Sequence, residues 1–370
     1  MSTGDVEDFG SEELGEVEAI EVLDESWPDY PLDELLIRNE SRTVHDVLRR
    51  IAQGQFIMNP DFQREVVWNR EKQSRLIESM MMRIPLPVFY LAEDPQGRMV
   101  VVDGLQRLST FSDFVGNKIR LTLPARPDLH RKQFRDLSPL HQNRIEDCNL
   151  ILYIIDSKVP ERARLDIFER VNAGQPLTRQ QMRNSLYNGE GTRWLKKEAA
   201  HEIFIEATGK SLTSRTMRDR EFVNRYCAWE LGSSGDIPEY SGDMDSFLAS
   251  ALSEMNRFDV PALGLMARRF RKSMRNNLHI FGKNSFRKIS NNRAGRSVIN
   301  AAIWDVMSTG LASYSEGEVE DRADVLRGAF YGLMDDKRFW DSITYGTNSV
   351  SMVNSRFNSV NHMLKEVFGA

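Results

Sequence analysis

The sequence has few cysteines and no long apolar run, and both absences narrow its class. Cys148 and Cys227 are too few for a disulfide framework and are typical of a reducing compartment. No run of about 18 apolar residues could form a transmembrane helix, and the acidic N-terminus has no apolar signal core. These features predict a cytoplasmic globular protein without a membrane partner.

Zinc-binding and Walker-type motifs are also missing. The sequence has no Cys-x-x-Cys pair and no two histidines at zinc-ligand spacing, so we expect no metal site of that kind. Gly209-Lys210-Ser211 ends like a P-loop, but Phe204 stands where the first glycine of that motif belongs. Any nucleotide site of this chain is therefore not of the Walker type.

Charge is distributed unevenly along the chain. Residues 1–40 hold fourteen acidic side chains and one basic, whereas residues 256–300 hold eleven basic and one acidic. We expect residues 1–30 to form an acidic disordered tail, which either solubilises the protein or covers a basic surface. The basic segment favours an anionic partner.

Hydrophobic periodicity predicts an α+β protein, in which a small mixed sheet with helices is followed by an all-helical region. Up to about residue 190, short apolar runs alternate with amphipathic helical patterns; beyond that, β-branched runs disappear. The expected strands are 55–58, 87–93, 98–102 and 149–155. Two helices are expected to begin at residues 44 and 138. The other expected helices span 70–82, 161–171, 178–187, 192–206, 215–231, 243–257, 261–276, 295–312, 317–334 and 351–368.

The stretch 98–107 is the leading candidate for a functional site. Its β-branched run predicts a strand, Asp103-Gly104 predicts a turn, and the apolar spacing that follows predicts a helix. Gln106 and Arg107 then lie in the first helical turn, where unpaired N–H groups and the helix dipole favour an anion. An arginine fork beside those amides is suited to phosphate.

Two further stretches flank this one. Asn59-Pro60-Asp61-Phe62-Gln63-Arg64-Glu65-Val66-Val67-Trp68 lies upstream, and Phe168-Glu169-Arg170-Val171-Asn172-Ala173-Gly174-Gln175-Pro176-Leu177 lies downstream. In this order, the three stretches resemble the N-terminal domain of GmrSD-type restriction enzymes, a ParB/sulfiredoxin-like family with an Asp-Gly-Gln-Gln-Arg motif. The resemblance covers residues 40–190. Leu105 departs from it, because the family usually has glutamine there.

The resemblance implies a ParB/sulfiredoxin-like nucleotide-binding domain over residues 31–190 and leaves a helical domain over residues 191–370. Arginines of such a site can clamp phosphate oxygens, and amides can contact a base or ribose. Asp103 and Arg107 would be the catalytic residues of an NTPase, with Asp103 holding Mg²⁺ or orienting a water. The implied residues for binding the NTP are Gln63, Arg64, Asp103, Gly104, Gln106, Arg107, Arg170 and Asn172.

The implied function is nucleotide-dependent DNA recognition or regulation in a restriction-type, anti-phage defence system. Full-length enzymes of this family also carry a histidine-asparagine-histidine nuclease motif, which this sequence does not show. A stand-alone form of the domain is therefore expected to act with a separate nuclease or effector subunit. Two alternatives stay open: a DNA endonuclease or nicking enzyme that uses the same turn, and a non-enzymatic, partner-binding regulator whose pocket is vestigial.

Two residues of this region also have a purely structural interpretation. Asp103 and an arginine can form a buried pair that only sets the fold. Trp68 can stack on a base, although a lone tryptophan is more often a packing anchor.

A second candidate site is a run of basic residues in the helical half. Spaced cations with polar neighbours suit contacts to a nucleic-acid backbone, which position DNA without reading its sequence. The alternative is a solvated helix face. The predicted DNA-binding residues are Arg268, Arg269, Arg271, Lys272, Arg275, Lys283, Arg287 and Lys288.

Overall fold

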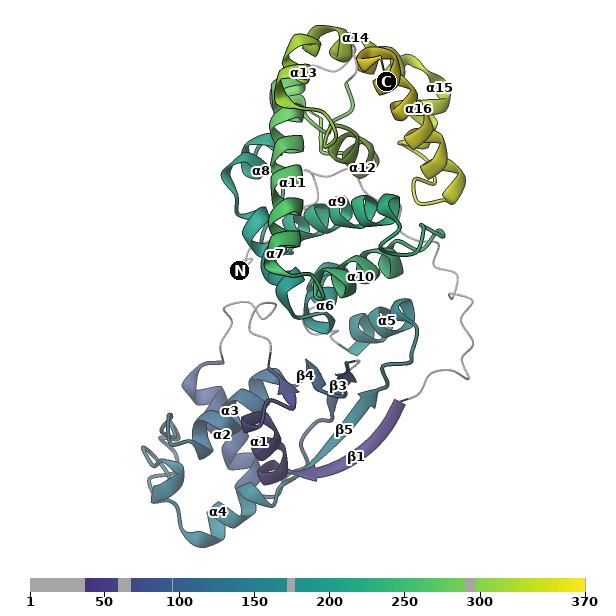
Figure 1. Cartoon of the computed structure of the whole chain (residues 1–370). Helices are drawn as coiled ribbons and strands as arrows, with labels where there is room; N and C mark the ends of the chain where they lie inside the picture. The colour runs from purple at the N-terminus through teal and green to yellow at the C-terminus, as the bar shows by residue number, and fades with distance from the viewer. Residues whose placement is uncertain (1–36, 59–67, 95, 172–176, 290–296, 370) are drawn as a thin grey trace, which may run out of the picture. The chain divides into compact units, whose positions relative to one another are not determined.

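The computed structural model describes residues 37–58, 68–94, 96–171, 177–289 and 297–369. They form two compact units, which lie within residues 28–188 and 189–370. The described part of the first unit holds a mixed sheet with helices, and that of the second holds helices and an isolated β-bridge (Figure 1). The predicted α+β class is therefore confirmed. The expected acidic tail lies outside the described residues.

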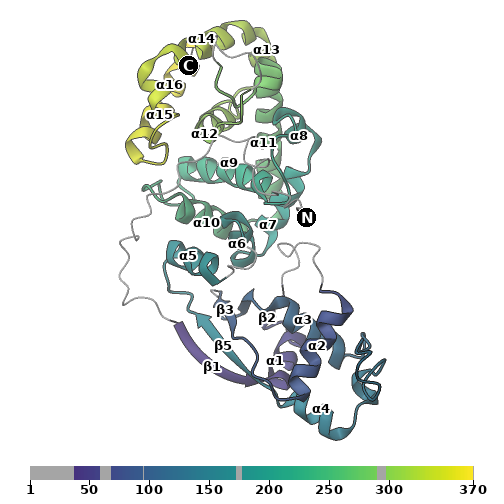
Figure 2. The same cartoon turned by 180° about the vertical axis from the view of Figure 1, so that it is seen from behind.

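The five-stranded sheet of the first unit has the order β1-β5-β3-β4-β2 (Figures 1 and 2). β5 pairs antiparallel with β1 and parallel with β3, while β4 pairs antiparallel with β3 and parallel with β2. Strand β1 was not expected, because its polar sequence has no apolar alternation. The strands are β1 Ile37–Thr43, β2 Phe56–Ile57, β3 Phe89–Glu93, β4 Met99–Asp103 and β5 Asn149–Ile155.

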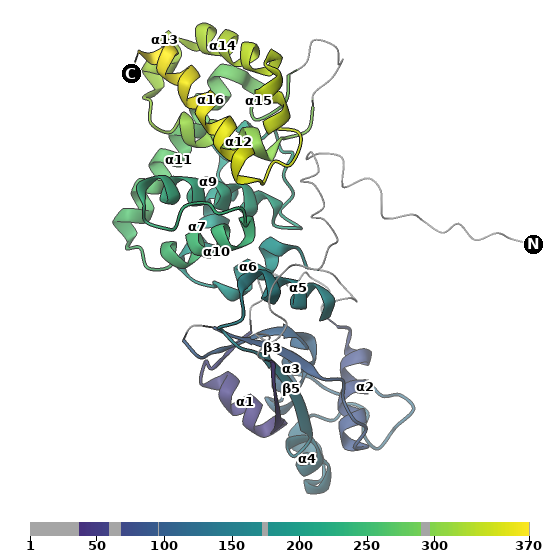
Figure 3. The same ribbon diagram turned by 90° about the vertical axis from the view of Figure 1, so that its right-hand side faces the viewer.

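Helices cover both faces of this sheet. On β3, Phe89 and Leu91 point into the core shared with α1 to α4, whereas Ala92 points into a second core with α5 and α6. Figure 3 shows α5 and α6 on one side of the strands and α1 and α2 on the other. The helices are α1 Val44–Ala52, α2 Arg70–Met81, α3 Leu105–Val115, α4 Pro139–Glu146, α5 Glu161–Val171 and α6 Arg179–Leu186.

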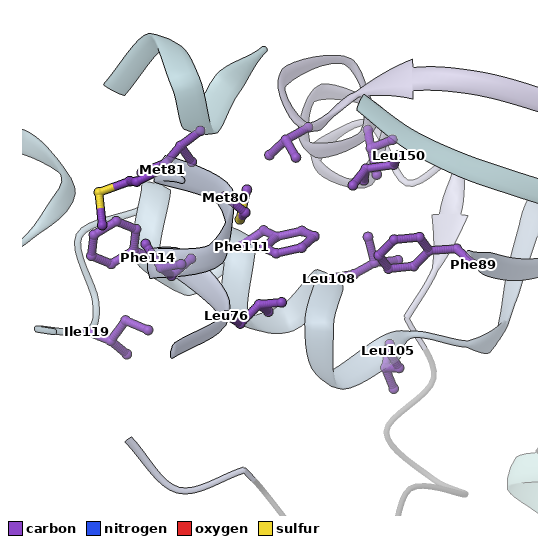
Figure 4. Close-up of a cluster of buried hydrophobic side chains, with 14 of the residues drawn as sticks. Leu76, Met80, Met81, Phe89, Leu105, Leu108, Phe111, Phe114, Ile119 and Leu150 are labelled. Carbon is purple, nitrogen blue, oxygen red and sulfur yellow. The ribbon is translucent and has the colours of Figure 1, made fainter. Parts of the chain in front are cut away.

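The larger core fixes α3, the helix that follows the candidate turn. Phe111 and Phe114 of α3 are fully buried and lie among Leu76 and Met80 of α2 and Phe89 of β3 (Figure 4). Burying a side chain of this size contributes roughly 2–3 kcal/mol. Because the start of α3 continues directly into this packing, the turn before it has a defined position.

A buried tryptophan with four phenylalanine neighbours lies in the core of the second unit. Trp304 of α12 is fully buried, and its ring centroid lies 4.4–6.5 Å from those of four phenylalanines on other segments. The helices of this unit are α7 Glu190–Ala199, α8 Glu202–Ala207, α9 Arg218–Ser234, α10 Met244–Met255, α11 Val260–Phe281, α12 Ala301–Gly310, α13 Glu316–Asp321, α14 Ala323–Asp335, α15 Lys337–Ser342 and α16 Val350–Phe368.

Some helices of this unit differ from the predicted ones, and in one case local capping gives the reason. The predicted helix 192–206 is two helices, because the imidazole of His201 accepts the N–H of Ile203 and starts α8. The predicted helix 317–334 divides at Arg322, and α15 was not predicted.

Next to Trp304, Asp305 joins three helices through a buried ion cluster. Its carboxylate accepts two hydrogen bonds from Arg225 of α9, at 2.8 and 2.7 Å, and one from Arg356 of α16, at 3.2 Å. All three side chains are at most 2 % exposed. Because two cations share one anion, the carboxylate is required to keep both guanidinium groups buried.

We predict that Asp305→Ala lowers the free energy of unfolding by about 3–5 kcal/mol, because it leaves two buried cations without their anion. Urea denaturation measures the change. The matched control is Asp324→Ala, which removes a 93 % exposed carboxylate paired with Arg327 at 2.8 Å and should cost less than about 1 kcal/mol. Equal effects of the two substitutions would contradict the role given to Asp305.

Candidate functional site

The turn between β4 and α3 depends on glycine. Asp103 ends the strand, Gly104 has φ +102° in the left-handed region, and α3 begins at Leu105. A Cβ on Gly104 would lie 2.3 Å from Cδ1 of Phe89, far inside contact distance. Both the backbone angle and the close approach of the Phe89 ring therefore exclude a side chain at residue 104. The strand, turn and helix predicted for this stretch are all present.

Arg107 reaches back from the first turn of α3 into the protein. Its guanidinium donates to the carbonyl oxygens of Pro87 and Val88, the latter at 2.9 Å, and to Oδ2 of Asp103 at 2.8 Å. The same group lies 4.1 Å from the centroid of the Phe89 ring. Arg107 thus ties the start of α3 to the segment that enters β3.

This environment is apolar as well as hydrogen-bonded. Arg107 is 8 % exposed, and burial lowers the pKa of its guanidinium, an effect that the Asp103 carboxylate opposes. The described hydrogen bonds of Arg107 are those of an internal tie, although only the arginine of the Asp103–Arg107 pair is buried. A direct contact between Arg107 and a phosphate stays a prediction.

Asp103 is placed differently from its partner. Its side chain is 40 % exposed, and Oδ2 accepts the hydrogen bond from Arg107. Among the described residues no partner of Oδ1 is seen. Arg107 therefore fixes the orientation of a carboxylate that stays accessible at the end of β4.

Gln106 links the turn to the upstream motif. Its side-chain oxygen accepts the backbone N–H of Trp68 at 3.3 Å. Trp68 packs against the larger core, and the ammonium of Lys72 lies 4.3 Å from its ring centroid. Packing, the commoner role for this tryptophan, is thus observed. Gln63 and Arg64, which precede Trp68, lie outside the described residues.

The downstream motif is described in part. Arg170 is exposed in the last turn of α5, which packs on the face of the sheet opposite to α3, and Asn172 lies outside the described residues. A second polar cluster, which the sequence did not predict, lies between α5 and α6. Tyr187 donates to Glu161 at 2.8 Å, and burial raises the pKa of this phenol. Arg164, 3.7 Å from Glu161, donates to the carbonyl of Glu93.

Several of the predicted DNA-binding cations form ion pairs within the helical unit. Arg271 makes two hydrogen bonds of 2.7 Å to the buried carboxylate of Glu198. Arg269 pairs with Glu230 at 2.8 Å, and Arg275 pairs with Glu316 at 2.7 Å. These ion pairs neutralise positive charge that a nucleic acid would otherwise contact.

The remaining predicted cations differ in exposure. Arg287 is 3 % exposed and donates to Thr208 and Ser211, while Lys288 donates to Thr344. Within the described ranges, no carboxylate pairs at 4.0 Å or less with the three others, which are Arg268, Lys272 and Lys283.

Neither a cluster of metal ligands nor a membrane-spanning helix occurs in the parts of the chain that the structure describes. In the described parts of the chain, no three His, Cys, Asp or Glu side chains are grouped so that they could hold a metal ion. None of the described helices is both long and apolar enough to span a bilayer.

We predict that Gly104→Ala costs about 2–4 kcal/mol of unfolding free energy, because backbone strain adds to overlap with Phe89. Gly54→Ala is the matched control: φ there is +72°, but nothing lies within 4 Å of the added Cβ, so only strain of about 1–2 kcal/mol remains. Chemical denaturation of both variants separates the two terms. A cost at residue 104 no larger than at residue 54 would refute the close packing of this turn.

Comparison with known proteins agrees with the sequence motifs. Residues 44–188 match the family model of the GmrSD restriction endonuclease N-terminal domain. No curated protein and no solved structure matches the chain significantly. The matched range contains β2 to β5 and α1 to α6, including the Asp103–Arg107 turn. Residues 44–188 therefore belong to the family of GmrSD restriction endonuclease N-terminal domains.

Proposed function

We propose that this protein is a nucleotide-dependent DNA-recognition and regulatory component of a restriction-type, anti-phage defence system. The family of residues 44–188 supports the restriction context. The nucleotide would bind at the turn between β4 and α3. Its binding or hydrolysis would alter the affinity of this protein for DNA or for a separate nuclease or effector subunit.

The observation that carries this proposal is the conformation of Gly104. It places the positive end of an 11-residue helix directly after the exposed carboxylate of Asp103. Residue 104 has no side chain that could cap this helix end, so the approach of an anion is not blocked by a capping group. An anion here would meet the helix dipole and the first-turn amides.

The contacts of the two charged residues support different proposed roles for them. Arg107 is a positioning residue, because its guanidinium holds Asp103 and two backbone carbonyls. Asp103 is the residue that would hold Mg²⁺. Since the described residues offer no group of three metal ligands, the ion would take its other ligands from phosphate oxygens and water, as is usual for nucleotide-bound Mg²⁺.

DNA contacts of the helical unit would come from the predicted cations that have no described carboxylate partner. Arg268 and Lys283 are exposed, and Lys272 is half-buried. Contacts of this kind bind phosphates and give affinity that depends on salt rather than on sequence. Arg269, Arg271 and Arg275 would contribute less, because each already pairs with a glutamate.

The burial of Arg107 favours a second candidate function. An arginine whose hydrogen bonds all serve the fold is what a vestigial pocket would keep, so a non-enzymatic, partner-binding regulator is the runner-up. An endonuclease that uses the same turn would instead cleave plasmid DNA in the presence of Mg²⁺ and lose that activity on Asp103→Ala.

The test is isothermal titration of ATP and of GTP, each with Mg²⁺, into wild-type protein and Asp103→Asn. Loss of the carboxylate charge should weaken binding of the preferred nucleotide at least about tenfold, equivalent to 1.4 kcal/mol. Asp113→Asn is the matched control, because Asp113 is 39 % exposed and pairs with Lys118 at 3.3 Å. It should bind like the wild type.

Two results would overturn the proposed site. If the wild type binds neither nucleotide while its thermal unfolding stays cooperative, the regulator with a vestigial pocket is the better account. If Asp103→Asn and Asp113→Asn bind a nucleotide with the same affinity as the wild type, the nucleotide lies elsewhere.

A further inference from the structure

The segment between α3 and α4 is rich in cations. Residues 117–135 hold six lysine and arginine side chains and one acidic side chain. Figures 2 and 3 show this segment beside α2, where the backbone N–H of Thr122 donates to Oγ of Ser74 at 2.7 Å. The segment therefore belongs to the packed unit and presents its charges from a fixed position.

Its sequence sorts apolar side chains inward and cations outward. Ile119, Leu121 and Leu123 are at most 6 % exposed and belong to the larger core, whereas Lys118 and Arg120, on either side of Ile119, are exposed. This alternation has the period of an extended chain. The apolar half anchors the segment, so the charged half needs no further ordering to bind a ligand.

The chain then turns back beside this stretch, through Arg131 and Lys132 to a short 3-10 helix at Phe134–Asp136. Arg131 donates its N–H to the carbonyl of Leu121 at 2.8 Å, and Leu121 donates to the carbonyl of Lys132 at 2.9 Å. Farther along, the backbone N–H of Arg135 donates to the side chain of Asn117 at 2.9 Å. These bonds gather five cations from two adjacent stretches, which we name the 118–135 basic surface: Lys118, Arg120, Arg131, Lys132 and Arg135.

Nearby carboxylates pair with two of the five cations of this surface and leave the other three without an ion pair that the structure describes. Asp128, the acidic residue of the segment, pairs with Arg126 at 3.0 Å, and Glu78 of α2 approaches the same arginine at 3.6 Å. Lys118 pairs with Asp113 at 3.3 Å, and Arg135 lies 3.9 Å from Asp136. Arg120, Arg131 and Lys132 make no ion pair within 4.0 Å in the described part of the chain.

The two central arginines are held together. The guanidinium of Arg120 donates to the carbonyl of Arg131 at 3.1 Å, and Arg131 itself has φ +65°. This left-handed backbone is uncommon for arginine and costs free energy. Packing of the segment offsets this cost, and the two charged side chains remain exposed at adjacent positions.

We propose that the 118–135 basic surface binds the phosphate backbone of double-stranded DNA. Closely spaced cations on a rigid support, four of the five exposed and three of the five outside any ion pair that the structure describes, are what such binding requires. This surface lies in the restriction-family unit and is separate from the cations of α11. The inference rests on the DNA-recognition part of the proposed function but is independent of the nucleotide site.

The test is fluorescence anisotropy of a fluorescein-labelled DNA duplex over a series of salt concentrations, with full-length protein. The double variant Arg120→Glu/Arg131→Glu should bind at least about tenfold more weakly at low salt. The slope of log affinity against log salt should fall by about 2, one phosphate contact for each arginine. Arg120→Gln/Arg131→Gln should show the same loss of slope without charge reversal.

The matched control is Arg49→Glu/Lys158→Glu, which changes net charge equally at two exposed residues of the same unit. It should keep the wild-type slope. Thermal unfolding and nucleotide titration of each variant check that the unit stays folded. Unchanged affinity and slope in both arginine variants would overturn this surface and leave the proposed function standing, whereas a wild type that binds no duplex at low salt would overturn both.

Discussion

The buried guanidinium of Arg107 is the contact on which the candidate site depends. It joins three parts of the chain: the end of β4 through Asp103, the start of α3, and the segment before β3 through two backbone carbonyls. A charged group this deeply placed is stable only when its donors are satisfied, and here carbonyls, a carboxylate and the Phe89 ring do so. The geometry of Asp103 follows from this tie.

The tie also changes the role that is expected of Arg107 within the motif. Proximity to a helix N-terminus suggests a phosphate clamp, yet the side chain of Arg107 points into the fold and lends its charge to orienting a carboxylate. The function proposed for this turn would then depend on the helix end and on Asp103, and Arg107 would act by holding both in place. In α11, likewise, glutamates form ion pairs with arginines that the sequence alone would suggest are unpaired.

Local sequence signals predicted much of the fold. The strand, turn and helix around Gly104, the capping of α1 by Thr43 and the start of α4 at Ser138-Pro139 all follow from interactions over a few residues. The partners of Arg107 could not be predicted in this way, because Pro87 and Val88 lie about twenty residues earlier and contribute carbonyls rather than side chains. Strand β1 was not predicted for a related reason, because only its pairing with β5 makes it a strand.

Charge patterning was the least predictable feature. The run of cations in α11 stands out in the sequence, but its neutralising glutamates come from α7, α9 and α13. The cations between α3 and α4 are more scattered in sequence, and backbone pairing brings them together. A run of basic residues in the sequence therefore does not by itself show which surface can meet an anion, because the tertiary structure decides which cations stay unpaired.

The most direct test of this account is NMR of the arginine side chains during titration with ATP or GTP and Mg²⁺. If Arg107 is an internal tie, its guanidinium signals stay in place while the backbone amides of Gly104, Leu105 and Gln106 shift. If the Arg107 guanidinium signals shift most and those amides do not, the arginine itself contacts the ligand and the account is wrong.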